Sequence, residues 1–199
     1  MTREFSAQLA ARICHDFANP LGAIGNGLEL MELSGGPVGP EMALIQDSLT
    51  QAKGQLRMLR LAFGPCADTN DTNAQTTAVL VDTVNAVGRV KLHAEPSLKL
   101  GSHDSQIAAL ALMCLENALP LGGTAQVHRT PTSLGILAEG RKVTHDPGIW
   151  AWVTDTAIDE PQLPSSRLQF PALGAAIANR GWQADITTSD SDITLAFGP

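Results

Sequence analysis

The first third of the chain carries two stripes of apolar residues with the spacing of an α-helix. In the first stripe, apolar side chains recur every three or four residues at Leu9, Ile13, Phe17, Leu21, Ile24, Leu28 and Met31. The second stripe repeats this spacing at Ile45, Leu49, Ala52, Leu56, Leu59 and Phe63. Because residues spaced in this way fall on one side of a helix, each stripe predicts a helix with a single apolar face.

Glycine and proline mark where these two helices begin and end. The segment 34–40, SGGPVGP, separates the stripes, and Gly64 and Pro65 follow the second one. Both residue types interrupt helices, and a short connection favours antiparallel neighbours. We therefore expect an antiparallel helical hairpin.

A hairpin with one apolar seam cannot bury that seam by itself. Pairing with a second copy of the chain would give a four-helix bundle in a homodimer, which is the simplest solution and the one we favour. The alternative is that the seam packs against the remainder of the same chain.

The remainder of the chain has a mixed pattern. Residues 66–75, CADTNDTNAQ, are polar and aperiodic, so we expect a linker between an N-terminal hairpin, 1–66, and a second domain, 75–199. Helices are predicted over 76–87, 104–119 (with Asp104 or Ser105 at the cap) and 171–180 (opened by Pro171). Strands are predicted within 90–94, 122–130, 182–187 and 193–197, whereas 133–139 and 150–155 are ambiguous. Helices interleaved with strands indicate an α+β protein with an α/β sandwich.

Composition excludes several functional classes. The formal net charge of −7 gives no basic surplus for nucleic acid, and the few aromatic residues make a base-stacking platform improbable. The apolar runs are too short to span a bilayer, and the N-terminal segment lacks the apolar core of a signal peptide. We expect a soluble, cytoplasmic protein, in which Cys14, Cys66 and Cys114 are reduced and mostly buried.

The other side of the first predicted helix is polar or small. It carries Gln8, Arg12, His15, Asn19, Gly22, Asn26 and Glu29, again at spacings of three and four. At about 100° per residue, His15 lies roughly 180° from the centre of the apolar stripe. His15 is therefore predicted to face solvent, although an exposed histidine can also have no role.

The residues around His15 suit phosphoryl chemistry. An imidazole nitrogen can attack phosphorus when the other ring nitrogen is held by a hydrogen bond. Asp16 could orient the ring, and Asn19, one turn further along, could position a water molecule or a phosphoryl oxygen. Pro20 should bend the helix just past the site, and Gly22 would let a partner approach the backbone.

These residues resemble a known family. The string HDFANPL, residues 15–21, resembles the phosphoacceptor motif of dimerising histidine-kinase helices, and LAARICHDFANPLGAIGNGLELM resembles ChpT-type histidine phosphotransferases more closely. Further along, DSQIAALALMCLENALPLGGTAQV, PALGAAIANRGWQADI and SDITLAFGP are similar to parts of the kinase ATPase domain. The resemblance implies a dimeric four-helix bundle followed by a kinase-ATPase-like α/β sandwich.

The chain differs from histidine kinases at the motifs with which a kinase binds its nucleotide. No DxGxG turn occurs, and HDPGIW, residues 145–150, lacks the second glycine. The glycine-rich segment that exposes backbone amides to phosphate has become PALGAA. Of the paired asparagines only Asn117 remains, with Met113 at the other position and Pro120 in place of a basic residue. We therefore expect a degenerate domain without a nucleotide site, in which Asn117 is structural.

The resemblance implies a histidine phosphotransferase in a two-component phosphorelay. A receiver domain would pass its phosphoryl group to His15, a second receiver would remove it, and Arg12, Gly22 and Asn26 would lie in the docking face. Mg²⁺ would belong to the receiver, so this chain needs no metal or other cofactor. Its remaining histidines show no metal-ligand spacing with Cys, Asp or Glu.

Two rival functions remain open. One is an active histidine kinase with a divergent nucleotide pocket, and the other is a non-catalytic scaffold that only binds receivers. Phosphatase action through Asn19 and a water molecule could coexist with transfer.

Overall fold

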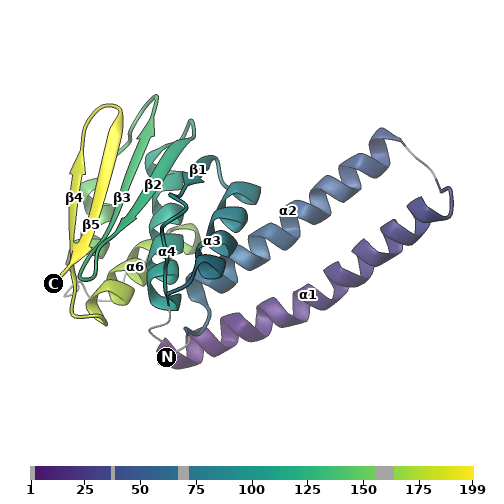
Figure 1. The fold of residues 1–199 in the computed structure, drawn as a ribbon, viewed down its shortest axis with the longest axis horizontal. Helices are drawn as coiled ribbons and strands as arrows, with labels where there is room; N and C mark the ends of the chain where they lie inside the picture. Colours follow the sequence, from purple (N-terminus) through teal and green to yellow (C-terminus); the bar gives the residue numbers. More distant parts are fainter. Residues whose placement is uncertain (1–2, 37–38, 67–71, 156–163) are drawn as a thin grey trace. The chain divides into compact units, whose positions relative to one another are not determined.

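The chain folds as an α+β protein, shown as a computed structural model in Figure 1. The structure describes residues 3–36, 39–66, 72–155 and 164–199, apart from the side chains of residues 3–13, 15, 16 and 165. The chain divides into two compact units, Met1–Pro65 and Cys66–Pro199. Each unit is described by itself below.

The first unit is a pair of antiparallel helices, α1 (Arg3–Leu33) and α2 (Pro40–Phe63) (Figure 1). Both predicted helices are thereby confirmed. α1 continues through Pro20 and ends near Gly35, which adopts a positive φ of 76° that favours glycine. Pro40 is the first residue of α2. Proline is favoured there because the first N–H groups of a helix make no intrahelical hydrogen bond.

Small residues line the contact between the two helices. The Cys14 thiol donates a hydrogen bond to the Leu56 carbonyl oxygen at 3.7 Å, which ties the middle of α1 to α2. A Cβ atom added at Gly25 would lie 3.3 Å from Leu49 Cδ2 and 2.6 Å from Lys53 Nζ. A side chain at Gly25 would therefore collide with Leu49 and Lys53 of α2, so this glycine lets α2 approach α1 closely.

The second unit is a two-layer sandwich of helices on one face of a five-stranded sheet. Its elements are α3 (Ala74–Val87), β1 (Val90–His93), α4 (Ser102–Ala118), β2 (Gly123–Arg129), β3 (Leu134–Gly140), α5 (Pro147–Thr154), a 3₁₀ turn (Ser165–Arg167), α6 (Gln169–Ala178), β4 (Gln183–Thr188) and β5 (Asp192–Gly198). The strand order is β1-β2-β3-β5-β4, with β1 parallel to β2 and the other pairs antiparallel.

The core of this unit lies between α4, α6 and the inner face of the sheet. Strand residues alternate between buried and exposed, as in β2, where Ala125 and Val127 are buried while Thr124, Gln126 and His128 are exposed. The largest fully buried side chains include Phe170, Phe197, Leu110, Leu115 and Ile136. The opposite face of the sheet is polar.

Several boundaries differ from the sequence prediction. α3 begins at Ala74, after the cap residue Asn73, so the last two residues assigned to the linker are helical. The cap of α4 is Gly101 rather than Asp104 or Ser105; both lie inside the first turn and are buried. α6 begins two residues before Pro171, which occupies the first turn. The ambiguous segment 133–139 corresponds to β3, and 150–155 corresponds largely to α5.

Helices α5 and α6 are in close contact. The Trp150 ring is buried and meets the Phe170 ring edge-on, with 5.0 Å between their centroids. A Cβ atom added at Gly174 would lie only 2.3 Å from the Trp152 carbonyl oxygen. The absence of a side chain at Gly174 therefore sets how closely α6 approaches α5.

We expect Gly174→Ala to destabilise the second unit, because the added methyl group meets backbone that cannot rotate away. A loss of about 1–3 kcal/mol in the free energy of unfolding is typical of such overpacking. Urea unfolding followed by circular dichroism measures it. Gly135→Ala is the matched control. The nearest atom to the added Cβ would be the Leu195 carbonyl oxygen at 3.9 Å, so the free energy of unfolding of this variant should be unchanged. Equal stability of the two variants would contradict the packing argument.

Candidate functional site

The candidate site lies along one side of α1. The motif HDFANPL occupies residues 15–21 within this helix. The backbones of Arg12, His15 and Asp16 are helical, and their side chains lie outside the described part of the structure. The roles predicted for these three residues therefore stay predictions.

The described site residues are accessible. Asn19 and Asn26 are exposed, and Gly22 is half-buried. A Cβ atom added at Gly22 would find no heavy atom within 4 Å, so the space beside this backbone is open. Asn19, Gly22 and Asn26 follow His15 by four, seven and eleven residues. These spacings place all three on the same side of the helix as the His15 position. This side of α1 could admit another protein.

The thiol next to the histidine points elsewhere. Cys14 is 5 % exposed, and its sulfur donates to α2, as described above. Burial raises the pKa of the Cys14 thiol, and the Arg60 guanidinium acts in the opposite direction. Burial also raises the pKa of Cys114 well above its ordinary range. Cys14 and Cys114 are buried, as the sequence predicts, whereas Cys66 is half-buried. The Cys14 thiol contributes to the contact between α1 and α2.

Part of the apolar stripe on each helix remains uncovered. Phe17 and Ile24 of α1 are 59 % and 51 % exposed, and Ile45 of α2 is 47 % exposed. Met31 and Leu59 are exposed as well, although Leu21, Leu28, Leu49 and Leu56 are partly buried. Contiguous exposed apolar side chains of this size mark surfaces that associate.

In the second unit, residues expected near a nucleotide are engaged by the chain itself. The Asn117 amide donates to the Met113 carbonyl oxygen at 3.1 Å, and the Arg167 guanidinium donates to Asn117 Oδ1. Asp146, of the sequence HDPGIW, caps α5 by accepting from the Gly148 backbone N–H at 3.0 Å. His145 stacks on Trp150, with 6.1 Å between the ring centroids.

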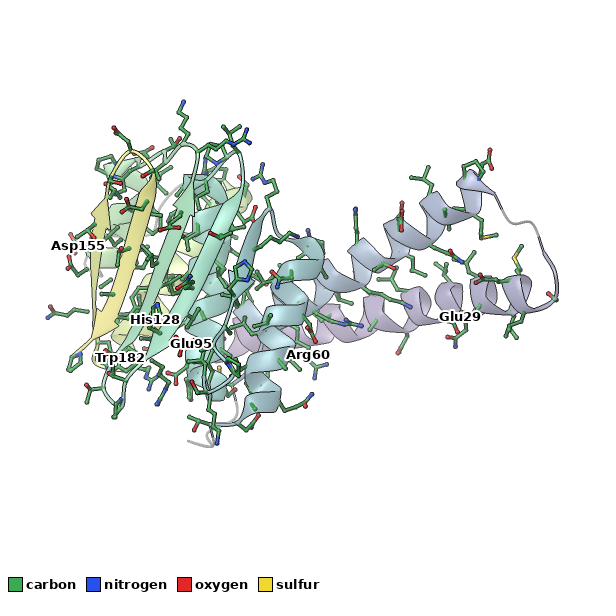
Figure 2. All side chains as sticks on the ribbon, turned by 45° about the horizontal axis from the view of Figure 1, so that its top comes forward. Glu29, Arg60, Glu95, His128, Asp155 and Trp182 are labelled. Carbon is green, nitrogen blue, oxygen red and sulfur yellow. The ribbon has the colours of Figure 1, made fainter. Side chains whose placement is uncertain are left out.

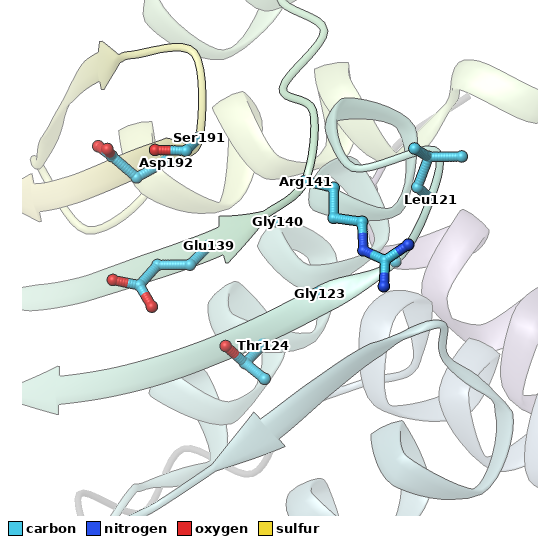
Figure 3. Close-up of a pocket in the computed structure, with 9 residues that line it drawn as sticks. Leu121, Gly123, Thr124, Glu139, Gly140, Arg141, Ser191 and Asp192 are labelled. Carbon is cyan, nitrogen blue, oxygen red and sulfur yellow. The ribbon is translucent and has the colours of Figure 1, made fainter.

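An open cavity of about 830 Å³ lies instead where β2, β3 and β5 meet their turns (Figure 3). Glu139 and Asp192 are cross-strand partners beside it, and Arg141 and Leu121 lie at its other side. Its lining carries like charges on neighbouring strands and no buried polar group directed into it. We assign it no ligand.

A second polar cluster was missed by the sequence analysis. The buried carboxylate of Asp104 accepts from Arg129 Nε at 2.5 Å and from the Arg180 guanidinium. These residues are separated by 25 and 76 positions, so no local pattern links them. The sequence marks Asp104 only as a polar residue near the start of a helix.

Within the described residues, no group of three or more His, Cys, Asp or Glu side chains is arranged to hold a metal ion. None of the described helices is both long enough and apolar enough to cross a bilayer.

Three comparisons relate the chain to known proteins. Residues 74–192 match the family model of the histidine phosphotransferase C-terminal domain. The protein phosphotransferase ChpT of Brucella abortus is 42 % identical over 83 residues, which are 42 % of this chain and 35 % of that protein. The match thus spans about a third of the curated relative.

Two solved structures share the fold over almost the whole chain. A bacterial phosphotransferase structure superposes with a TM-score of 0.66 at 25 % identity, covering 94 % of this chain and 92 % of that one. Full-length ShkA in complex with AMPPNP superposes with a TM-score of 0.51 at 10 % identity, covering 96 % of this chain and 45 % of that one. Since the family model covers more than half of the sequence, the chain belongs to the histidine phosphotransferase family.

Proposed function

We propose that this chain relays a phosphoryl group between receiver domains of response regulators through a phosphohistidine at His15, without binding ATP. The observation that carries the proposal is the position of the HDFANPL motif within α1, where Asn19, Gly22 and Asn26 leave that side of the helix accessible. Family membership supports the same activity, and the curated relative is named a phosphotransferase.

The proposed transfer needs one nucleophile and no cofactor on this chain. An imidazole nitrogen of His15 attacks the phosphorus of an aspartyl phosphate, the N–P bond forms, and the acyl O–P bond breaks to release the receiver's carboxylate. The other ring nitrogen releases its proton to solvent, so that the imidazole ring of the phosphohistidine is neutral. In this proposal the Asp16 carboxylate orients that side of the ring. A second receiver's aspartate reverses these steps. The receiver supplies Mg²⁺ and the charge stabilisation.

The docking face in this proposal consists of Arg12, Gly22 and Asn26. The open space beside Gly22 allows a receiver to approach the helix backbone, and the exposed Asn26 offers a donor and an acceptor one turn further along. Along the helix, Asn19 lies between His15 and Gly22. It could direct a phosphoryl oxygen, or a water molecule if phosphatase action accompanies transfer.

Two features favour the phosphotransferase over an ATP-dependent kinase. The Arg167 guanidinium donates a hydrogen bond to the Asn117 side-chain oxygen, and the Asp146 carboxylate caps α5. A nucleotide would have to break these contacts without a glycine-rich loop to receive its phosphates.

The proposed active form is a homodimer in which α1 and α2 of two copies form a four-helix bundle. Exposed Phe17, Ile24 and Ile45 support it, because large apolar side chains gain about 1.5–3 kcal/mol each when fully buried. Covering this side leaves the polar side of α1, with the His15 position, available to receivers.

His15→Ala should abolish phosphorylation by a phosphorylated receiver. The measurement is transfer of labelled phosphate to the chain, which should be acid-labile and alkali-stable in the unchanged protein. Alanine favours helix, so circular dichroism should be preserved. The matched control is His93→Ala, an exposed histidine on β1, which should accept label normally. Persistence of label in His15→Ala would place the phosphoacceptor at another residue and refute the role of His15. Absence of label from the unchanged protein would refute the relay and favour a scaffold.

Calorimetry with a non-hydrolysable ATP analogue and Mg²⁺ should detect no saturable binding. The chain lacks the glycine-rich loop that would expose backbone amides to the phosphates, and the Asn117 side-chain oxygen already accepts from Arg167. A dissociation constant below about 100 μM (roughly −5.5 kcal/mol) together with autophosphorylation from ATP would establish the kinase instead.

Ile24→Glu should convert the dimer to a monomer while preserving the helices. Placing a carboxylate in the proposed seam leaves it desolvated and unpaired, which should weaken association at least ~100-fold. Sedimentation equilibrium measures the dissociation constant. Leu121→Glu is the control, because Leu121 is 68 % exposed in the second unit and its replacement should leave the dimer intact. A dimer insensitive to Ile24→Glu would place the interface elsewhere.

A further inference from the structure

A second polar pocket lies at one end of the second unit, away from the large cavity. It has a volume of about 320 Å³ and lies between the end of β2 and the connection from β1 to α4. Figure 2 shows Glu95 and His128, two of its lining residues, at the same end of the unit. Its polar lining consists of Thr72, Glu95, Ser97, Lys99, His128 and Arg129.

Arg129 is held in position before any ligand binds. Its Nε donates to Asp104 Oδ2 at 2.5 Å, and the Asp104 side chain is only 3 % exposed. A guanidinium has five N–H donors in a rigid plane, and this contact uses the one on Nε. The remaining edge can bind an anion without first losing conformational freedom.

The charges around Arg129 leave an excess of positive charge. The Asp104 carboxylate is shared with Arg180, whose guanidinium lies over the Trp182 ring at 3.8 Å from its centroid. One buried carboxylate therefore faces two guanidinium groups. The pocket lining adds one more positive charge, at Lys99, and one more negative charge, at Glu95. This excess occurs in a chain with a formal net charge of −7, so it is a local feature rather than a general one.

The donors also differ in kind and direction. The pocket offers a guanidinium edge, an ammonium group, an imidazole and the hydroxyls of Ser97 and Thr72, from the segment before α3, the β1–α4 connection and β2. A planar carboxylate is satisfied by one guanidinium fork, whereas a tetrahedral phosphate accepts donors from several directions. Glu95 could accept from a hydroxyl carried next to the phosphate.

We propose that this pocket binds the phosphate group of a small molecule. The site is independent of the phosphotransfer proposed for His15, because its residues all belong to the second unit and none takes part in that chemistry. Arg129 and Lys99 contact the phosphate, and Asp104 is a positioning residue that orients Arg129.

The test is a titration of the isotope-labelled full chain with inorganic pyrophosphate at constant ionic strength, followed by amide NMR. Saturable shifts are expected at Ser97, Lys99, His128 and Arg129. Lys99→Gln should weaken binding by about three- to fivefold, as expected for one partly solvated charge contact. Lys142→Gln, an exposed lysine outside the pocket, is the matched control and should bind normally.

Two further measurements make the result decisive. Arg129→Lys keeps the positive charge beside Asp104 but loses the planar guanidinium, so it should weaken pyrophosphate binding while the fold stays intact. If this variant unfolds, the comparison of Lys99→Gln with Lys142→Gln still tests the site. Succinate should bind more weakly than pyrophosphate, and equal binding would overturn the preference for phosphate. Shifts that do not saturate, or equal effects of Lys99→Gln and Lys142→Gln, would overturn the site. His15→Ala should bind pyrophosphate normally, which separates this test from that of the phosphorelay.

Discussion

Two helices packed against each other can each bury only one side, and this limit governs the first unit. On the α1 side, this contact carries small residues, with Cys14 bonded to α2 and Gly25 against Leu49 and Lys53. Large side chains such as Phe17, Ile24 and Ile45 are left outside. α1 therefore has three distinct sides: one of small residues toward α2, one apolar and uncovered, and one polar. Because burial of the apolar side by a second copy would leave the polar side free, the proposed dimer and the proposed phosphoacceptor position follow from the same arrangement.

In the second unit, polar side chains expected near a nucleotide are bonded within the chain itself. A domain that binds a nucleotide can leave asparagine and aspartate side chains to be satisfied by the ligand. Here Asn117 is bonded to Arg167 and to the carbonyl of Met113, and Asp146 caps α5. Since the Asn117 side chain and one carboxylate oxygen of Asp146 already have partners within the chain, a nucleotide would have to compete with these bonds. This is the physical basis for proposing that the unit does not bind ATP.

The elements that the sequence predicted well are those determined locally. α1 and α2 combine a long 3.6-residue period with glycine and proline at their ends, and the β4–β5 hairpin alternates around a polar turn. β3 and α5 could not be assigned, because LGILAEG and PGIWAWVT are short apolar runs compatible with either a helix or a strand. Asp104 was interpreted as a helix cap, which is the usual role of an aspartate at such a place. Its actual partners, Arg129 and Arg180, are distant in sequence, and no local preference indicates them.

The proposed chemistry does not require the second unit to bind a nucleotide. A kinase must hold ATP, Mg²⁺ and the histidine in one enclosed geometry, so most of its catalytic groups lie around the nucleotide. In the proposed transfer, the reactive acyl phosphate and its Mg²⁺ arrive together on the receiver. What this chain must then provide is an accessible nucleophile and a helix surface that a second protein can approach, and the open space at Gly22 serves that purpose. Under this proposal the requirement on the chain falls on an exposed face of α1 rather than on a nucleotide pocket.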